Sequence, residues 1–499
     1  MESLQHLLLG LSVAATPANL FYCLLGCLLG TLVGVLPGIG PSATIAMLLP
    51  ITFNLDATSA MIMLAGIYYG AQYGGSTTSI LVNVPGQPES VVTAIDGHQM
   101  ARQGRAGVAL ATAAIGSFVA GCIATVFVAF FAPLLAGLAL SFGPAEFFSL
   151  VVFGLIASAA IAQGSMLRAL AMILLGLMLG IVGTDVTSGT RRLTLGWLEL
   201  ADGLNVIAVL MGLFGLAEIL RNLEDQHTAP VRIAKVTSLM PSRQDLRAMS
   251  APILRGTMLG SILGILPGGG ALLASFGAYV LEKRLARDRS RFGKGAIEGV
   301  AAPEAANNAG AQTSFIPMLT LGIPSNVIMA MMAGALIMQG IIPGPGVMSQ
   351  QPALFWGLIV SMWIGNLMLV VLNLPLVGMW VKVVSIPYRL LYPAIMLFCA
   401  IGIYSMDNSI FDVYVMILFG GIGYLLHKLD CEPAPMLLGM LLGPMMEENL
   451  RRAMLLSRGD PMVFLERPIS AGLLAAALLA VVIVAVPAIR RRRDEALQE

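Results

Sequence analysis

Two runs of polar residues lie inside otherwise apolar stretches of this 499-residue chain, and they are the residues best suited to bind a ligand. Polar groups at membrane depth are costly unless they are satisfied, and they usually mark a transport pathway. Hydroxyl, amide and backbone oxygens suit Na⁺, whereas amide and hydroxyl donors suit carboxylates. The alternative is packing, in which Ser, Thr and Asn side chains bond across helix interfaces. We assign Gly74, Gly75, Ser76, Thr77, Thr78, Pro324, Ser325 and Asn326 to substrate, and Asn83, Glu304, Asn307, Asn308, Gln312, Thr313 and Ser314 to a cation, Na⁺ being possible.

Glu304 is the acidic member of the second run. It lies between a basic loop and the pair Asn307-Asn308, so it can coordinate a cation or carry a proton. An interfacial acid that answers Lys294 or Arg291 is an equally good interpretation.

A duplicated sequence motif indicates where backbone groups become free to bind a ligand. Residues 30–40 read GTLVGVLPGIG and residues 260–270 read GSILGILPGGG. A Pro-Gly break in a membrane helix frees N–H and C=O groups, which is tolerable only against protein or a wet cavity. A helix that starts after the break presents free N–H groups and a positive dipole end, which suits an anion. Close helix packing or a hinge is the alternative. The substrate residues assigned here are Pro37, Gly38, Gly40, Ser42, Pro267, Gly268, Gly269 and Gly270.

The duplication continues beyond this phrase, since residues 74–88 align with 310–324 and match at Gly74/Gly310. Basic residues fill the loop 283–294, whereas its counterpart near Asn54 has none; the loop that ends at Arg105 is basic, whereas its counterpart has no Lys or Arg. Because Lys and Arg collect on the cytoplasmic side, equivalent loops lie on opposite faces. The pattern predicts two inverted-topology repeats with the site near the bilayer midplane.

These patterns predict an all-α polytopic membrane protein with re-entrant hairpins, broken helices and about 10–12 spans. The expected organisation is an amphipathic segment over 1–18, a first membrane repeat over 19–220, and a cytoplasmic linker over 221–251. A second repeat over 252–446, an extracytoplasmic loop over 447–469, and a last span with a basic cytoplasmic tail over 470–499 follow.

Composition supports the membrane class and excludes others. The chain is 57% hydrophobic and only 11% charged, far below the roughly 25% charged residues of soluble domains. Its net charge of +1 gives no basic field for nucleic acid. The five cysteines and four histidines form no metal-ligand spacing, and no P-loop or nucleophile motif is present. We expect neither an enzyme nor direct ATP drive.

The quoted motifs resemble a known family. LVGVLPGIGPSATIAMLLP, YYGAQYGGSTTSILVNVPG, GILPGGG and PEAANNAGAQTSFIPMLTLGIPS resemble the large membrane subunit of the tripartite tricarboxylate transporters (TctA family). The resemblance covers residues 15–490. It implies secondary transport of a di- or tricarboxylate or another organic carboxylate, driven by Na⁺ or H⁺, with no further cofactor.

The resemblance also implies partners and a location. The partners are a small four-span membrane subunit and a periplasmic substrate-binding protein, and the location is the bacterial inner membrane with the C-terminus in the cytoplasm. The alternatives are a stand-alone carboxylate exporter and a gated anion channel, and a membrane enzyme is disfavoured by the missing nucleophile.

Overall fold

The computed structural model describes residues 2–36, 40–83, 86–161, 165–185, 188–224, 236, 239–266, 270–384 and 388–485. Apart from one pair of two-residue strands, β1 (Gly183–Thr184) and β2 (Arg191–Arg192), the regular structure of this part of the chain is helical. Five helical stretches are long and apolar enough to cross a membrane: Pro17–Val35, Pro88–Ala139, Val206–Glu224, Pro352–Asn373 and Ile410–Lys428. Six shorter apolar helices accompany them. The predicted all-α polytopic class is confirmed; the number of full spans stays a prediction.

The first half begins with a helix that packs on the second half. In α1, His6 stacks on Trp356 of α17 with ring centroids 5.2 Å apart. The next helix has a clear start signal, since the Thr16 hydroxyl caps it and Pro17 occupies its first turn. The helices of this half are α1 (Glu2–Ala14), α2 (Pro17–Val35), α3 (Pro41–Thr52), α4 (Ala57–Val82), η1 (Pro88–Ser90), α5 (Val91–Met100), η2 (Ala101–Arg105) and α6 (Ala106–Ala139).

The second half, from α11 to α18, is also helical. Its first helix starts with a capping box between Ser242 and Asp245. The helices are α11 (Arg243–Leu263), α12 (Gly270–Leu285), η4 (Arg289–Arg291), α13 (Glu298–Thr313), α14 (Phe315–Leu321), α15 (Val327–Met338), α16 (Gly346–Gln350), α17 (Pro352–Asn373) and α18 (Val377–Val384).

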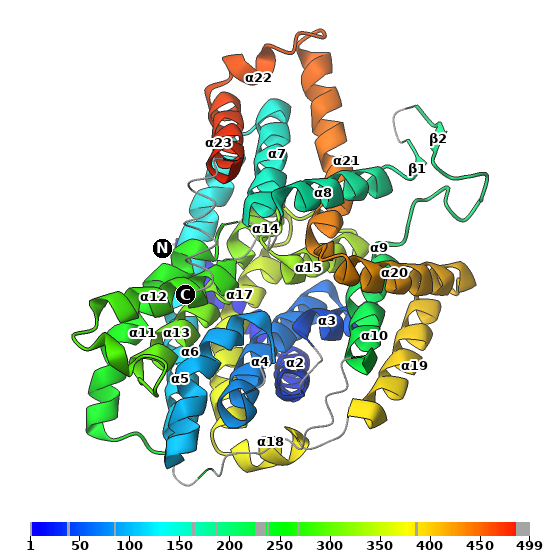
Figure 1. The fold of residues 1–499 in the computed structure, drawn as a ribbon. Helices are drawn as coiled ribbons and strands as arrows, with labels where there is room; N and C mark the ends of the chain where they lie inside the picture. The colour runs from blue at the N-terminus through cyan, green and yellow to red at the C-terminus, as the bar shows by residue number, and fades with distance from the viewer. Residues whose placement is uncertain are drawn as a thin grey trace.

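The remaining helices lie around this centre, and α21 to α23 with α7 project from it at the top of Figure 1. α21 runs to Leu456, so residues 447–456, expected to be loop, are helical. In α21, Arg451 pairs with Asp185 and Glu447. The helices are α7 (Pro144–Ile161), α8 (Met166–Gly180), α9 (Val206–Leu210), η3 (Met211–Leu216), α10 (Ala217–Glu224), α19 (Tyr388–Asp407), α20 (Ile410–Lys428), α21 (Pro433–Leu456), α22 (Val463–Glu466) and α23 (Pro468–Ala485).

In each half, a row of glycines at every fourth position packs one helix closely against another; we call each row a glycine ladder. On α2 the glycines press on α4, and on α11 they press on α13, so closely that a Cβ at any of them would overlap a backbone carbonyl oxygen. Small residues at every fourth position let membrane helices approach in this way. The ladders are Gly26, Gly30 and Gly34 against Met63, Ile67 and Ala71, and Gly256, Gly260 and Gly264 against Ala302, Ala306 and Gly310.

These contacts give a different register for α4 and α13 than the sequence alignment. Gly34 faces Ala71 while the equivalent Gly264 faces Gly310, so Gly310 corresponds to Ala71, three residues before Gly74. The left-handed residues that end α4 and α14, the helix that follows α13, agree with this register, with φ 56° at Asn83 and 73° at Gly322. The glycine contacts and the alignment of identical residues therefore give registers that differ by three residues.

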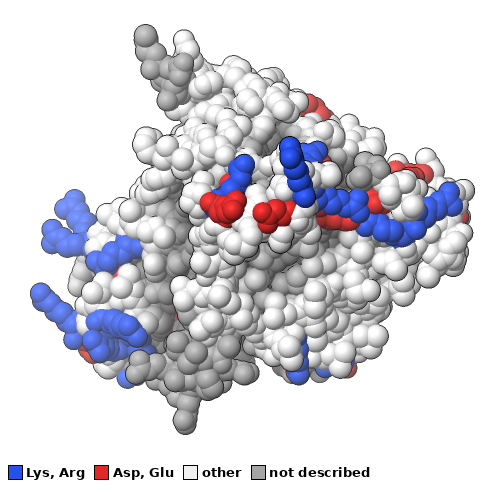
Figure 2. Space-filling view, turned by 90° about the horizontal axis from the view of Figure 1, so that it is seen from above, with Lys and Arg blue, Asp and Glu red and all other residues white. Residues whose placement is uncertain are grey.

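The molecular surface carries few charges. Seen from above, Lys, Arg, Asp and Glu side chains gather in separate groups, and most of this face is uncharged (Figure 2). The apolar side chains of Phe130, Leu167 and Leu478 are at least 65% exposed, as expected for helices that face lipid.

Candidate functional site

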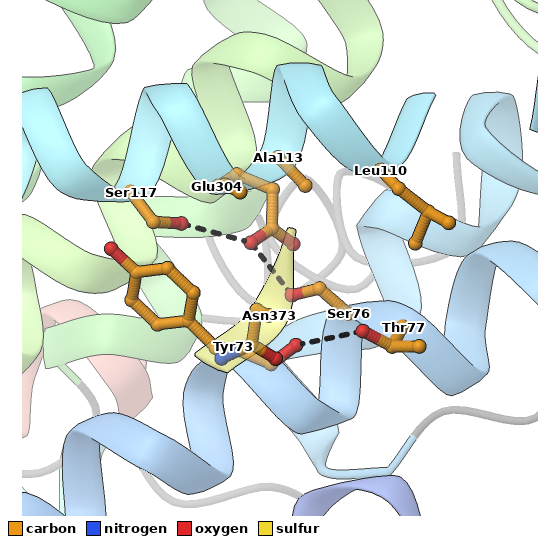
Figure 3. A pocket seen from close by; sticks show the side chains of 9 residues that line it. Tyr73, Ser76, Thr77, Leu110, Ala113, Ser117, Glu304 and Asn373 are labelled. Atoms are coloured by element: carbon orange, nitrogen blue, oxygen red, sulfur yellow. Dashed lines mark hydrogen bonds between the residues drawn. The ribbon is translucent and has the colours of Figure 1, made fainter. Parts of the chain in front are cut away.

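The centre of the site is the Glu304 carboxylate, which is fully buried on α13. Three hydroxyl groups from three other helices donate hydrogen bonds to it. The Ser76 hydroxyl of α4 is 2.7 Å from Oε2, the Ser117 hydroxyl of α6 is 3.4 Å from Oε2, and the Thr93 hydroxyl of α5 bonds Oε1. Figure 3 shows Ser76 and Ser117 reaching the carboxylate from different helices. An isolated buried carboxylate is costly, so this shell of donors is what makes its burial tolerable.

The shell continues into Asn308, one helical turn along α13. Its Nδ2 donates to the Ser117 hydroxyl at 2.7 Å and to the Glu304 backbone carbonyl at 3.0 Å. A pocket beside the carboxylate is lined by Tyr73, Ser76, Thr77, Leu110, Ala113, Ala114, Ser117, Glu304 and Asn373 (Figure 3). It has room only for a group about the size of one water molecule. A monovalent cation fits this pocket, whereas a tricarboxylate does not.

The interfacial interpretation of Glu304 does not agree with these contacts. Arg291 pairs with Glu298, with 3.1 Å between Nη2 and Oε2. The carboxylate of Glu304 instead faces the neutral hydroxyls of its shell.

Some residues of the first polar run, on α4, line the pocket, and others only make packing contacts. Ser76 and Thr77 line the pocket, whereas Gly74 packs against the Thr31 carbonyl and the Thr78 hydroxyl lies 3.0 Å from the Gly75 carbonyl of its own helix. Gly75 lies against the Gln87 side chain, whose amide donates to Gln72. Asn83 is exposed and forms the C-cap of α4.

The second run also divides. Gln312 accepts a hydrogen bond from the Thr125 hydroxyl at 3.4 Å, whereas the hydroxyls of Thr313 and Ser314 bond carbonyls of their own helix. Asn307 is fully buried, and among the described residues neither polar atom of its side chain has a partner. An orphaned buried amide costs about 1–3 kcal/mol, so Asn307 stays a candidate residue for binding a ligand.

The loop before α15 contains the assigned substrate residues Pro324, Ser325 and Asn326. Ser325 is buried and donates to the Ser314 carbonyl at 3.3 Å. Asn326 caps α15, with its Oδ1 2.9 Å from the Met329 amide, and Pro324 beside them is buried. Ser325 therefore ties this loop to the end of α13, whereas the Asn326 side chain is used to start a helix.

The duplicated breaks lie largely outside the described residues, namely Pro37, Gly38, Pro267, Gly268 and Gly269. Gly40 and Gly270 stand where α3 and α12 begin, and Ser42 is half-buried in the first turn of α3. The Gly40 amide donates to Oε1 of Glu218 on α10 at 3.1 Å. The N-terminus of α3, which follows the first break, therefore already binds the carboxylate of Glu218.

Sequence reasoning missed Glu218, Thr93, Ser117 and Thr125. A signal for Glu218 exists, because it is the only charged residue in the apolar stretch 205–220. The three hydroxyl residues gave no comparable signal, since single Ser and Thr residues are common in membrane helices.

The donor set defines what the site can bind. No group of three His, Cys, Asp or Glu side chains comes together in the described part of the chain, so transition-metal chemistry has no cluster there. One carboxylate with hydroxyl and amide oxygens suits a hard cation such as Na⁺, or a proton on the carboxylate.

Comparison with known proteins identifies the family. The tripartite tricarboxylate transporter TctA family matches residues 20–438. The chain belongs to the TctA family. It is 59% identical over 499 residues to an uncharacterized 52.8 kDa protein in the TAR-I ttuC' 3' region of Agrobacterium vitis, which covers all of this chain and 99% of that protein.

A second relative covers half of the chain. An uncharacterized protein in the TAR-II ttuC' 3' region of Agrobacterium vitis is 60% identical over 240 residues, 48% of this chain and 99% of that protein. No solved structure matches.

Membership confirms the resemblance seen in the motifs. The TctA chain is a membrane subunit of a tripartite tricarboxylate transporter, a system with further subunits, and not an enzyme. Its apolar helices make it a multi-pass membrane protein.

Proposed function

We propose that this TctA chain is the translocating subunit of a secondary transporter that imports an organic carboxylate together with a cation. The observation that carries the proposal is the buried Glu304 carboxylate with its neutral shell of Ser76, Thr93 and Ser117. A buried carboxylate that pairs with no Lys or Arg among the described residues is suited to take up a cation.

Charge balance favours cotransport over transport of the anion alone. The duplicated motifs hold no Lys or Arg, yet a di- or tricarboxylate brings two or three negative charges. A helix N-terminus supplies only about half a charge. Cotransported Na⁺ or H⁺ supplies the rest, so the coupling ion lowers the cost of burying the substrate.

The broken helices supply the substrate site in this proposal. The N-termini of α3 and α12 bind substrate carboxylates, and the Pro324–Asn326 loop and the α4 hydroxyls complete the site. The two halves form inverted repeats that alternate the access of this site between the two faces. The pocket at Glu304 is too narrow for the substrate, which supports an occluded conformation.

Family membership supports a proposal for the membrane and the partners. The chain lies in a bacterial inner membrane with its C-terminus in the cytoplasm, beside a small four-span subunit. A periplasmic binding protein delivers the substrate, which is a di- or tricarboxylate or another organic carboxylate.

Reconstituted vesicles test the proposal. The chain and its partners are placed in vesicles with an imposed Na⁺ or pH gradient, and uptake of a panel of di-, tri- and aromatic carboxylates is measured. Uptake that follows one of the gradients is expected. Uptake that ignores both gradients and runs only down the anion gradient would identify an anion channel, and net export without partners would identify a stand-alone exporter.

A further inference from the structure

At the Glu304 site, α13 and α6 both carry polar residues at regular spacing. On α13 these are Glu304, Asn308 and Gln312, and on α6 they are Ser117 and Thr125, with Gly121 midway between them. Both series have a spacing of four residues, so each helix presents them along one face. We name these six residues the polar file.

Hydrogen bonds join the two sides of the polar file at both ends. Ser117 bonds Glu304 and Asn308 at one end, and the Thr125 hydroxyl donates to Gln312 at the other. The polar side chains of the file are at most 3% exposed. Eight residues of helix span about 12 Å, so the file extends over more than two turns of each helix.

An unsatisfied amide lies at the middle of the file. Asn366 of α17 is 1% exposed, and neither its Nδ2 nor its Oδ1 has a partner among the described residues. It fills the space beside Gly121, because a Cβ built on that glycine would lie 2.6 Å from Nδ2 and 2.7 Å from Oδ1. The file therefore has an amide without a partner among the described residues where Gly121 supplies no side chain, and an ion or a water molecule would satisfy such a group.

We propose that the polar file is the path by which a coupling Na⁺ reaches Glu304 from the end of α13 that joins α14. The inference rests on the proposed cation symport and adds the ion and its route. Carboxylate, hydroxyl and amide oxygens follow one another along the file, with the Asn366 oxygen as the intermediate ligand. Hard oxygen donors of this kind bind Na⁺.

The composition of the file favours a metal cation over a proton. A proton relay needs groups that accept and release protons, such as Asp, Glu and His side chains. Asn308, Gln312 and Asn366 are amides, whose NH₂ groups donate hydrogen bonds but do not ionise in this way. They interrupt a proton path but offer carbonyl oxygens to a cation.

The test uses Na⁺ itself as the probe. Binding and exchange of ²²Na⁺ are measured on the full chain with its partner subunits, for wild type, Thr125→Val and Glu304→Gln. Glu304→Gln is expected to weaken binding by about ten- to a hundredfold, the loss typical of a charged hydrogen-bonding group. Thr125→Val is expected to slow association and dissociation together by about three- to tenfold, because one oxygen of the route is lost.

A matched control separates the route from packing. Thr257 on α11 is also fully buried, and its hydroxyl bonds the carbonyl four residues earlier, as that of Thr125 does. Thr257→Val should leave Na⁺ exchange unchanged, and Thr125→Ser, which keeps the hydroxyl, should restore the wild-type rate.

Each outcome decides one part of the inference. Wild-type exchange in Thr125→Val, or equal slowing in Thr257→Val, overturns the route. Wild-type Na⁺ affinity in Glu304→Gln overturns its end point. If wild type binds no Na⁺ while uptake follows the pH gradient, the Na⁺ inference fails and cation symport survives. The proposed function itself fails only when uptake ignores both gradients.

Discussion

The Gly40 backbone amide at the start of α3 donates a hydrogen bond to the Glu218 carboxylate, with 3.1 Å between nitrogen and Oε1. Gly40 follows the first Pro-Gly break, whose helix N-terminus the sequence predicts to bind the substrate carboxylate. A carboxylate of the chain itself thus occupies the position at which a substrate carboxylate would gain from the helix dipole.

Glu218→Gln should therefore increase the apparent affinity for substrate. An amide is a weaker ligand for a helix N-terminus than a carboxylate, so the substrate displaces it more easily. Since an anion at a helix N-terminus gains about 0.3–2 kcal/mol, the concentration for half-maximal uptake should fall by about two- to thirtyfold. Uptake titrations with wild type and variant measure it. An unchanged affinity combined with lower thermal stability would mean that Glu218 is only a helix cap.

The glycine ladders give a prediction of stability. Gly30→Ala should destabilise the fold by about 1–3 kcal/mol, because the added methyl group overlaps the Ile67 carbonyl and the helices must separate. Gly137 on α6 is the control, since a Cβ there meets no atom within 4 Å. Gly137→Ala should be neutral or stabilising, because alanine is the better helix former. Thermal unfolding followed by size-exclusion chromatography compares the two, and equal stabilities would contradict the ladder.

Asn307 separates stability from function. Its side-chain amide is fully buried without a partner among the described residues, so Asn307→Leu removes a desolvation cost of about 1–3 kcal/mol and should raise the melting temperature. The same change should strongly reduce carboxylate uptake, because the amide is expected to bind a ligand. A stabilised variant with normal uptake would show that Asn307 has no role in transport.

Topology can be tested at two exposed positions, Asn54 and Arg289. Single cysteines there should react with a membrane-impermeant thiol reagent from opposite faces, because Lys and Arg gather in only one of the two equivalent loops. The five native cysteines are replaced first. Labelling from the same face would mean that the repeat is parallel or that the two loops are not equivalent.

The helical class and the position of the polar runs could be predicted from sequence, because hydropathy and helix breakers are local signals. The contacts of Glu304 could not. Thr93 and Ser117 lie 211 and 187 residues from it in the chain, and Glu218 lies 178 residues from Gly40. A hydroxyl residue carries no mark of its distant partner, so these pairs depend on how α5, α6 and α10 pack.

The repeat register shows the same limit. Gly74 and Gly310 match in sequence, but the ladder places Ala71 at the position equivalent to Gly310. Helix packing here depends on which face carries small residues, and an alignment of identical letters does not report that face.

Binding of the coupling cation and binding of the carboxylate substrate should be thermodynamically linked. If the cation at Glu304 neutralises part of the substrate charge, each ligand must raise the affinity for the other by the same factor. A coupling of about 1–3 kcal/mol is typical, which corresponds to about five- to 150-fold. Substrate affinity should therefore rise with Na⁺ at fixed pH in wild type. Glu304→Gln should flatten that rise, because it removes the charge on which the cation depends while leaving a side chain of similar size. Asn308→Ala and Thr77→Ala should shift the Na⁺ dependence to higher concentration without flattening it, since each changes the surroundings of the carboxylate and keeps its charge.

Titrations of substrate binding at several Na⁺ concentrations, repeated at several pH values, measure the coupling. A substrate affinity that stays constant in both series would mean that a basic residue neutralises the substrate, and Arg102, Arg105 and Lys294 would be the first residues to replace.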